Sequence, residues 1–340
     1  MIHLGIIGYG YWGPNLTRNF VEIPESTVVH VADLDPARLA LARSRYPGVK
    51  VSTDSREMLK DPRVDAVAIA TPVSTHYELA REVLESGRHV LVEKPMTETV
   101  RDGERLIELA EKKNRVLMVD HTFLYAGAVR KIKEIMDRRE LGEVYYFDSV
   151  RVNLGLFQQD VNVLWDLAAH DVAIMNHVLG LMPTAVSAIG AWHFKEGAED
   201  IAYLTALFEG RCIAHFHVNW LAPVKVRMTL IGGSRKMVVY DDTQASEKVK
   251  VYDKGLSVET REDIYRILVQ YRSGDMQAPQ LDPTEPLQIE CLHFLDCIRT
   301  GRKPLSDGQL GLNVVRILQA AQRSMRNRGR IVPVNGSADP

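Results

Sequence analysis

Lys94, Asp166 and His170 are the side chains whose type and position best suit proton transfer. Lys94 follows an apolar run and precedes a proline, so we expect it at the end of a buried strand. Asp166 and His170 are four residues apart, a spacing that places two side chains on one face of a helix. A lysine can stabilise a developing negative charge, and a histidine can exchange a proton near neutral pH.

Each of these assignments has a plainer alternative. Lys94 could form a surface ion pair with Glu93, and Asp166 could serve only to satisfy a half-buried His170. A metal site is not expected. His170 and His177 are seven residues apart, with no cysteine ligands and no His-Glu-x-x-His pattern.

A glycine-rich segment near the N-terminus carries the pattern Gly-x-Gly-x-x-Gly at Gly8, Gly10 and Gly13. An apolar run over residues 4–7 precedes it, and Pro14 suits the first turn of a following helix. Gly8 would allow a tight turn, Gly10 a close approach of a pyrophosphate, and Gly13 close packing of helix on strand. The segment predicts a strand, a turn and a helix whose N-terminus faces phosphate groups.

Asp33 supports a dinucleotide site because it ends a second predicted strand, residues 28–32, about 20 residues after Gly13. A carboxylate there accepts hydrogen bonds from ribose hydroxyls and repels a 2′-phosphate, which favours NAD over NADP. Arg38 weakens that preference slightly. Asp33 could instead cap the next helix, but Asp35, directly before a proline, suits that role better.

The composition predicts an ordinary soluble protein of two domains. The 340 residues are 46% hydrophobic and 25% charged, with a net charge of −2, so neither nucleic acid nor a membrane is an expected partner. Cys212, Cys291 and Cys297 form no Cys-x-x-Cys pair, which suggests reduced thiols and a cytoplasmic location. The sequence shows neither a secretory leader nor an apolar run of membrane-spanning length.

The first third of the chain alternates between strand-like and helix-like segments. The alternation predicts a parallel, doubly wound sheet in a first domain of residues 1–122. Ser52 or Thr53 is the expected N-terminal cap of the helix over residues 54–60. The predicted strands are 4–7, 28–32, 49–51, 64–70, 89–92 and 116–119, and the predicted helices are 36–46, 54–60, 74–86 and 99–113.

After the first domain, helices no longer alternate with strands, and most predicted strands follow one another directly. Residues 185–252 predict a large, mostly antiparallel sheet, and residues 123–340 form the second domain, of α+β class. The remaining predicted elements are helices 128–138, 164–179, 287–298 and 308–326 and a strand over 144–151.

Ligands of such a sheet bind beyond the carboxyl ends of its strands. Thr71-Pro72, Glu93-Lys94-Pro95 and Asp120-His121 all follow predicted strands there. Tyr11 and Trp12, inside the glycine loop, could line the same site or simply pack the loop.

These motifs carry a resemblance. Gly8-x-Gly10-x-x-Gly13, Thr71-Pro72 with His76 downstream, Glu93-Lys94-Pro95 and Asp166-x-x-x-His170 are similar to those of the glucose–fructose oxidoreductase / inositol dehydrogenase / rhizopine catabolism family. The similarity spans essentially the whole chain. It implies a Rossmann domain, an open-faced sheet domain, tightly held NAD(P), hydride transfer at a sugar or cyclitol carbinol, and a homodimer or homotetramer. The implied cofactor contacts are Gly8, Gly10, Tyr11, Trp12, Gly13, Asp33, Arg38, Thr71, Pro72, His76, Glu93, Lys94 and His121.

The sequence departs from the common family pattern before Asp166, where residues 162–165 replace a glycine run. With Trp-Asp-Leu-x-x-His-Asp it resembles members that act on nucleotide-activated sugars, in particular UDP-N-acetylglucosamine 3-dehydrogenases. A free-sugar or inositol dehydrogenase is the alternative within enzymes. A non-catalytic NAD- or metabolite-binding regulator is the alternative of another class.

In the implied reaction, His170 is the expected base, Lys94 stabilises the reacting oxygen and Asp166 orients His170 or holds a hydroxyl. Lys94 could be the base instead if its pKa fell to about 7–8, at a cost of about 4 kcal/mol. Polar residues before the helix could contact the substrate, or could be ordinary loop polarity. The candidate substrate contacts are Lys94, Arg151, Asn153, Gln158, Asn162, Trp165, Asp166 and His170.

Overall fold

A computed structural model describes residues 1–155, 160–253, 255–257, 270–272 and 274–335. The chain divides into two compact units. Unit 1 comprises Met1–Ala126 and Thr284–Arg316, and unit 2 comprises Gly127–Pro283 and Ile317–Pro340. The chain therefore passes from one unit to the other three times.

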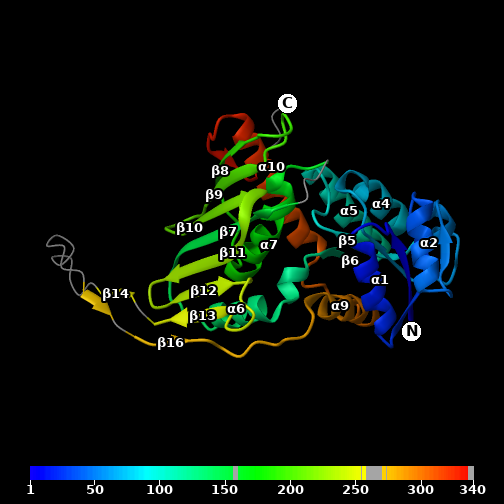
Figure 1. Cartoon of the computed structure of the whole chain (residues 1–340), viewed down its shortest axis with the longest axis horizontal. Helices are drawn as coiled ribbons and strands as arrows, with labels where there is room; N and C mark the ends of the chain where they lie inside the picture. Colours follow the sequence, from blue (N-terminus) through cyan, green and yellow to red (C-terminus); the bar gives the residue numbers. More distant parts are fainter. Residues whose placement is uncertain (156–159, 254, 258–269, 273, 336–340) are drawn as a thin grey trace. The chain divides into compact units, whose positions relative to one another are not determined.

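Unit 1 is built on a six-stranded sheet in the order β3-β2-β1-β4-β5-β6, in which all neighbouring strands are parallel (Figure 1). The predicted doubly wound parallel sheet is confirmed. Its strands other than the edge strand β3 are largely buried on both faces, as their apolar runs require. They are β1 (Ile2–Ile7), β2 (Ser26–Ala32), β3 (Lys50–Ser52), β4 (Ala66–Ile69), β5 (His89–Glu93) and β6 (Leu117–Asp120).

The helices of unit 1 follow the strands in alternation. They are α1 (Gly13–Glu22), α2 (Pro36–Arg45), α3 (Ser55–Leu59), α4 (His76–Glu85) and α5 (Val100–Lys113), with short 3₁₀ turns η1 (Val73–Thr75) and η2 (Thr122–Tyr125). One cap differs from the prediction. Asp54 caps α3 by accepting the Arg56 amide, whereas the Ser52 hydroxyl lies 2.8 Å from Nε2 of His30.

Two later helices, α9 (Pro286–Thr300) and α10 (Gly308–Arg326), confirm the predicted C-terminal helices. α9 packs on α1 within unit 1, where the rings of Phe20 and Phe294 meet with centroids 6.4 Å apart. The Arg18 guanidinium also reaches the Glu285 carboxylate at 2.5 Å. α10 begins in unit 1 and ends in unit 2.

Unit 2 contains a nine-stranded sheet in the order β16-β13-β12-β11-β7-β10-β9-β8-β17. Among its described strands only the pair β7–β10 is parallel, so the prediction of a mostly antiparallel sheet is confirmed. A separate two-stranded ribbon joins β14 (Gly255–Ser257) to β15 (Gln270–Arg272). The nine strands are β7 (Val144–Leu154), β8 (Ala185–Ala191), β9 (Ile201–Leu207), β10 (Ile213–Asn219), β11 (Leu221–Gly233), β12 (Met237–Asp241), β13 (Val249–Tyr252), β16 (Met276–Gln277) and β17 (Val332–Pro333).

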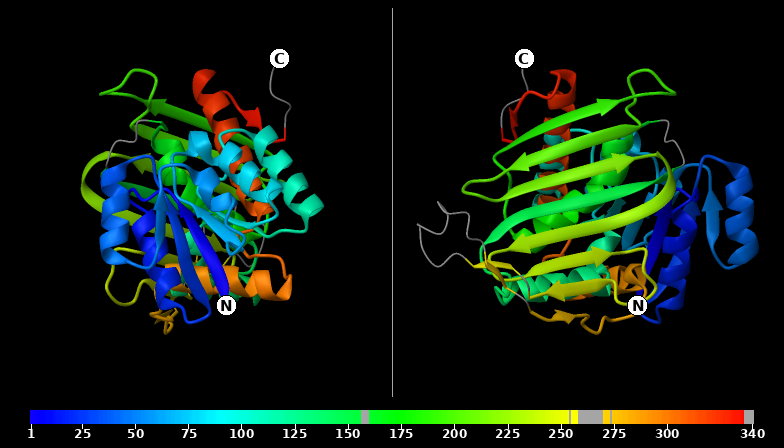
Figure 2. Two further views of the ribbon diagram at one scale, coloured as in Figure 1. Left: turned by 90° about the vertical axis from the view of Figure 1, so that its right-hand side faces the viewer. Right: turned by 60° about the vertical axis from the view of Figure 1, so that its left-hand side comes forward.

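One face of this sheet is covered by helices, and the other is open (Figure 2). Along β10, Ala214 and Phe216 are buried, whereas Ile213 and His215 are exposed, which is the alternation of a half-buried strand. The covering helices of unit 2 include α6 (Gly127–Asp137) and α7 (Ala169–Leu179). None of the helices in the described part of the chain is long and apolar enough to cross a bilayer.

Candidate active site

The glycine loop connects β1 to α1, and its backbone requires glycine at two positions. Gly8 has a φ of +93°, and a Cβ there would lie 2.4 Å from the Ala70 carbonyl oxygen. A Cβ on Gly13 would lie 2.0 Å from the Gly8 carbonyl oxygen. Both clashes involve backbone, which cannot give way, so β1, β4 and α1 pack closely only with these residues.

Gly10 differs, because its surroundings are open. A Cβ at Gly10 would meet only the guanidinium of Arg38, at 3.3 Å. Among the described residues no side chain caps the first turn of α1. An open backbone beside an uncapped helix N-terminus fits the pyrophosphate of a dinucleotide, and these residues would hold it.

Asp33 ends β2 beside the glycine loop. Its carboxylate is buried and accepts the backbone amides of Tyr9 at 2.6 Å and Asp35 at 2.8 Å. The half-exposed Arg38 lies 3.6 Å from the same carboxylate. Asp35 caps α2 by accepting the Ala37 amide, as predicted. Asp33 therefore combines a structural role in the loop with a position suited to a ribose.

His76 joins two of the segments that follow strands. Its buried ring lies between the Thr71 carbonyl oxygen, 2.8 Å from Nε2, and the Pro95 carbonyl oxygen, 2.9 Å from Nδ1. Pro72 is exposed, and Glu93 and Lys94 are half-buried at the end of β5. Through these contacts His76 connects the segment after β4 to the segment after β5.

His121 follows β6 and is fully buried. Neither ring nitrogen has a hydrogen-bond partner among the described residues. Burial, together with the charge of Lys94, lowers the pKa of His121 to about 3. His121 is therefore neutral at ordinary pH, and it can offer a hydrogen bond to a ligand without adding charge.

The burial of His121 predicts a measurable loss of stability in acid. The unfolded chain binds a proton below pH 6.5 and the folded chain does so only near pH 3, so stability falls as the pH falls between these values. Between pH 7 and pH 5, the wild type should lose about 2 kcal/mol more of its free energy of unfolding than the His121→Asn variant loses. Urea denaturation at both pH values measures this difference. His215→Asn, at an exposed position, should follow the wild type, and equal acid sensitivity in all three proteins would contradict the assignment.

In unit 2 the predicted helix over residues 164–179 begins differently from expectation. Residues Leu164–Ala168 form a π-helical turn, and α7 follows it. Such turns are frequent at functional sites. Asp166 lies in this turn, where its Oδ2 accepts the indole N–H of Trp220 at 3.1 Å. His170, in the first turn of α7, is half-buried.

Two of the proposed substrate contacts have other partners in the structure. Arg151 is buried and forms a two-bond ion pair with Asp171, at 2.9 and 2.7 Å. The amide nitrogen of Asn162 donates to Glu199 at 2.6 Å and to Gln322 at 2.8 Å. These interactions fix α7 and the π-helical turn to the rest of unit 2.

Asn153 and Trp165 remain half-exposed candidates, and Gln158 lies outside the described residues. Asn153 shares the helix-covered face of β7 with Arg151, because alternate residues of a strand point the same way. Trp220 and Asp171, which hold Asp166 and Arg151, were not predicted, since a partner distant in sequence leaves no local pattern.

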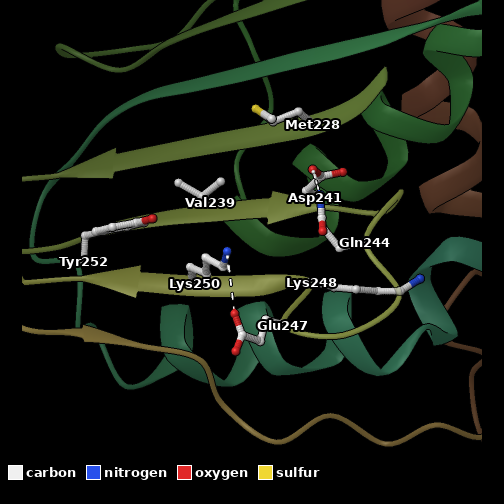
Figure 3. Close-up of a pocket in the computed structure, with 8 residues that line it drawn as sticks. All are labelled: Met228, Val239, Asp241, Gln244, Glu247, Lys248, Lys250 and Tyr252. Atoms are coloured by element: carbon white, nitrogen blue, oxygen red, sulfur yellow. Dashed lines mark hydrogen bonds and ion pairs between the residues drawn. The ribbon is translucent and has the colours of Figure 1, made fainter. Parts of the chain in front are cut away.

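A pocket of about 190 Å³ lies over β11, β12 and β13 (Figure 3). Val239 and Asp241 of β12 face it, so it opens on the side opposite Tyr240, which faces Arg151. Within it Lys250 pairs with Glu247 at 3.7 Å, whereas Lys248 pairs with Asp242, outside the lining, at 3.2 Å. It is therefore separate from the side of the sheet that carries α7. Its lining comprises Met228, Val239, Asp241, Gln244, Glu247, Lys248, Lys250 and Tyr252.

No group of three or more potential metal ligands occurs in the described parts of the chain.

Comparison with known proteins agrees with this arrangement. Residues 2–121 match the family model described as "Oxidoreductase family, NAD-binding Rossmann fold", and residues 129–238 match the "GFO/IDH/MocA C-terminal domain".

Among curated proteins, the chain is similar to the scyllo-inositol 2-dehydrogenase (NADP(+)) IolW of Bacillus subtilis, with 24% identity covering 97% of this chain and 96% of the relative. Two solved structures share the fold. The UDP-N-acetylglucosamine 3-dehydrogenase GnnA from Acidithiobacillus ferrooxidans has a TM-score of 0.82 at 22% identity, covering 96% of this chain and 98% of that one. The WlbA dehydrogenase from Bordetella pertussis, in complex with NADH and UDP-GlcNAcA, has a TM-score of 0.83 at 19% identity, covering 99% and 98%.

Both family models match, and the two units carry the corresponding sheets. The chain therefore belongs to the GFO/IDH/MocA family of oxidoreductases, with an N-terminal NAD-binding Rossmann fold.

Proposed function

We propose that this protein oxidises a secondary alcohol of a sugar with NAD, and that the sugar is nucleotide-activated, of the UDP-N-acetylglucosamine kind, and reacts at C3. The observation that carries the proposal is the placement of Lys94. It directly follows β5, two strands from β1 and the glycine loop, at the same carboxyl edge of the parallel sheet, and its charge acts on the buried His121. A cation at that edge suits an oxygen that becomes negatively charged as its proton leaves.

The bound cofactor supplies the hydride acceptor. Lys94 donates a hydrogen bond to the reacting hydroxyl oxygen and stabilises its developing charge. His170 accepts the hydroxyl proton, and Asp166, itself fixed by Trp220, positions His170 or a neighbouring sugar hydroxyl. The alternative assignment makes Lys94 the base and leaves His170 to bind the substrate.

The choice of a nucleotide sugar rests on the sequence Trp-Asp-Leu-x-x-His-Asp, on the substrate in the name of GnnA and on the UDP-GlcNAcA in complex with WlbA. Trp165 and Asn153, both half-exposed in unit 2, are the proposed contacts to the sugar or its nucleotide. The similarity to IolW supports the second candidate, an inositol or free-sugar dehydrogenase.

The test is the absorbance of reduced cofactor in purified protein with NAD and a panel of UDP-amino sugars, free hexoses and inositols. Reduction with a UDP-amino sugar alone would support the proposal. Reduction with inositol or a hexose alone would replace it with the second candidate. Bound NAD with no reduction by any compound would exclude all three substrate classes and favour a regulator.

Cofactor preference is a separate prediction, tested on Asp33. The Asp33→Asn variant keeps an oxygen that can accept the Tyr9 amide, but it removes the charge that repels a 2′-phosphate. The adjacent Arg38, which also lies 3.6 Å from Asp35, can then bind that phosphate. The ratio of NADPH to NADH affinity should therefore rise by roughly 10- to 100-fold, the range of one charged hydrogen bond.

Fluorescence titration with each reduced cofactor gives this ratio. The matched control is Asp54→Asn, which removes a carboxylate that caps α3 rather than one beside Arg38, and which should leave the ratio unchanged. Equal ratios in the wild type and in Asp33→Asn would show that Asp33 does not select the cofactor.

The open face of the unit 2 sheet is the proposed interface of a homo-oligomer. It exposes apolar side chains on neighbouring strands, including Ile189, Tyr203 and Ile213. Light scattering of the purified protein measures the oligomeric state, and a monomer at micromolar concentration would exclude this assignment.

A further inference from the structure

Helix α9 places a buried carboxyl group beside the residues at the end of β6 in unit 1. Glu290 is completely buried, and it faces the carboxylate of Asp120, the hydroxyl of Thr122 and, farther away, the carboxylate of Glu93. α9 also packs on η2, which begins at Thr122. A charged residue in such a place needs an explanation, because an isolated buried charge is costly.

Asp120, at the end of β6, connects Glu290 to the glycine loop. Its Oδ2 accepts the indole N–H of Trp12 at 2.6 Å, and its Oδ1 accepts the Thr122 hydroxyl at 2.6 Å. Trp12 lies between Gly10 and Gly13, and its carbonyl oxygen accepts the Asn15 and Leu16 amides of α1. The backbone of the loop is thus held at α1 and at Asp33, and its Trp12 side chain is held at Asp120.

The protonation of the two carboxyl groups follows from their surroundings. As ionised groups both can only accept hydrogen bonds. The nearby Thr122 hydroxyl already donates to Asp120, and neither oxygen of Glu290 has a hydrogen-bond partner of good geometry among the described residues. Burial raises the pKa of Glu290 well above its usual value, and the adjacent Asp120 carboxylate raises it further. Glu290 therefore keeps its proton and can donate it in a hydrogen bond to Asp120.

We propose that Glu290 and Asp120 form a carboxyl pair holding one proton, and that this pair fixes Trp12 so that the glycine loop is preorganised for the cofactor. Glu290 is a positioning residue, since it acts through Asp120 and Trp12. This rests on the proposed function only in its choice of NAD as cofactor, and it does not depend on which alcohol is oxidised.

NADH binding, followed by the change in NADH fluorescence on titration, tests the proposal without any sugar substrate. Glu290→Gln keeps the shape and a neutral hydrogen-bond donor, so its NADH affinity should stay within about threefold of the wild type. Trp12→Phe loses the indole N–H, and Glu290→Leu loses the donor, so each should bind NADH about tenfold more weakly. In the double variant Trp12→Phe/Glu290→Leu the two losses should not add, because they act through one chain of contacts.

The matched control is Glu285→Leu on the same helix, whose ion pair with Arg18 ties α9 to α1 but does not reach Trp12. It should leave NADH affinity unchanged even where it lowers the melting temperature. A tenfold loss in Glu290→Gln would show that an ionised carboxylate is required, and unchanged affinity in Trp12→Phe would remove the anchor. Additive losses in the double variant would likewise overturn the proposal.

Should Glu290→Leu fail to fold, Glu290→Gln and Trp12→Phe decide the question alone. A wild type that binds NADH but oxidises no sugar would refute the proposed function and leave this comparison intact.

Discussion

Replacing Lys94 with methionine should lower the turnover number by about 10²- to 10³-fold while NADH affinity changes little. Methionine keeps the unbranched stem but has neither the charge nor the donor that the reacting oxygen needs. Lys94 lies at the carboxyl end of β5, close enough to His121 to lower its pKa, so it belongs to the edge of the sheet where the cofactor loop lies. Steady-state kinetics with the substrate found by the panel, and NADH titration, measure the two effects separately.

Lys60→Met is the matched control, because Lys60 is an exposed lysine at the end of α3. It should have wild-type kinetics. Normal turnover in Lys94→Met would exclude both roles proposed for this lysine.

His170→Asn then separates the two candidate bases. If histidine is the base, the dependence of turnover on pH between 5 and 8 should flatten in this variant, and if Lys94 is the base it should persist.

The Arg151→Met variant should lose about 3–5 kcal/mol of unfolding free energy, because it leaves the buried Asp171 carboxylate without its partner. Both side chains are only 4% exposed and share two hydrogen bonds. The pair joins β7 to α7, the helix that carries His170, so its loss should also reduce activity. Urea denaturation at neutral pH gives the free energy of unfolding.

Two comparisons distinguish a buried charge from a mere lost contact. Arg151→Met combined with Asp171→Leu removes both charges and should recover much of the lost stability, since a buried ion pair can often be replaced by apolar residues. Arg63→Met breaks the pair that the exposed Arg63 forms with Asp61, and it should leave the free energy of unfolding nearly unchanged. Similar losses for Arg63→Met and Arg151→Met would contradict the assigned importance of burial.

The sequence was sufficient for the features that depend on local pattern. The glycines of the loop are required by the backbone at Gly8 and Gly13, so residue type and spacing are enough to find them. Strand and helix periodicity gave the parallel sheet of unit 1 and the mostly antiparallel sheet of unit 2. Asp35, directly before a proline, identified the cap of α2.

The features that depend on distant partners could not be predicted. Arg151 and Asn162 suggested substrate contacts because they stand in or near an irregular stretch, but their partners Asp171, Glu199 and Gln322 are 20 to 160 residues away. Glu290 lies in an apolar helical pattern, where a lone glutamate suggests an exposed edge. Its burial beside Asp120 follows only from the docking of α9 on η2.

Unit 1 is built from two stretches of chain that are far apart in sequence, and this affects how it forms during biosynthesis. When Ala126 leaves the ribosome, α9 has not been made, and at about 5–20 residues per second it follows on the order of ten seconds later. During that time Phe20 on α1 lacks Phe294, and Trp12 and Asp120 lack Glu290. Until α9 is made, the face of α1 that packs on it stays uncovered. The cofactor site is therefore complete only near the end of synthesis.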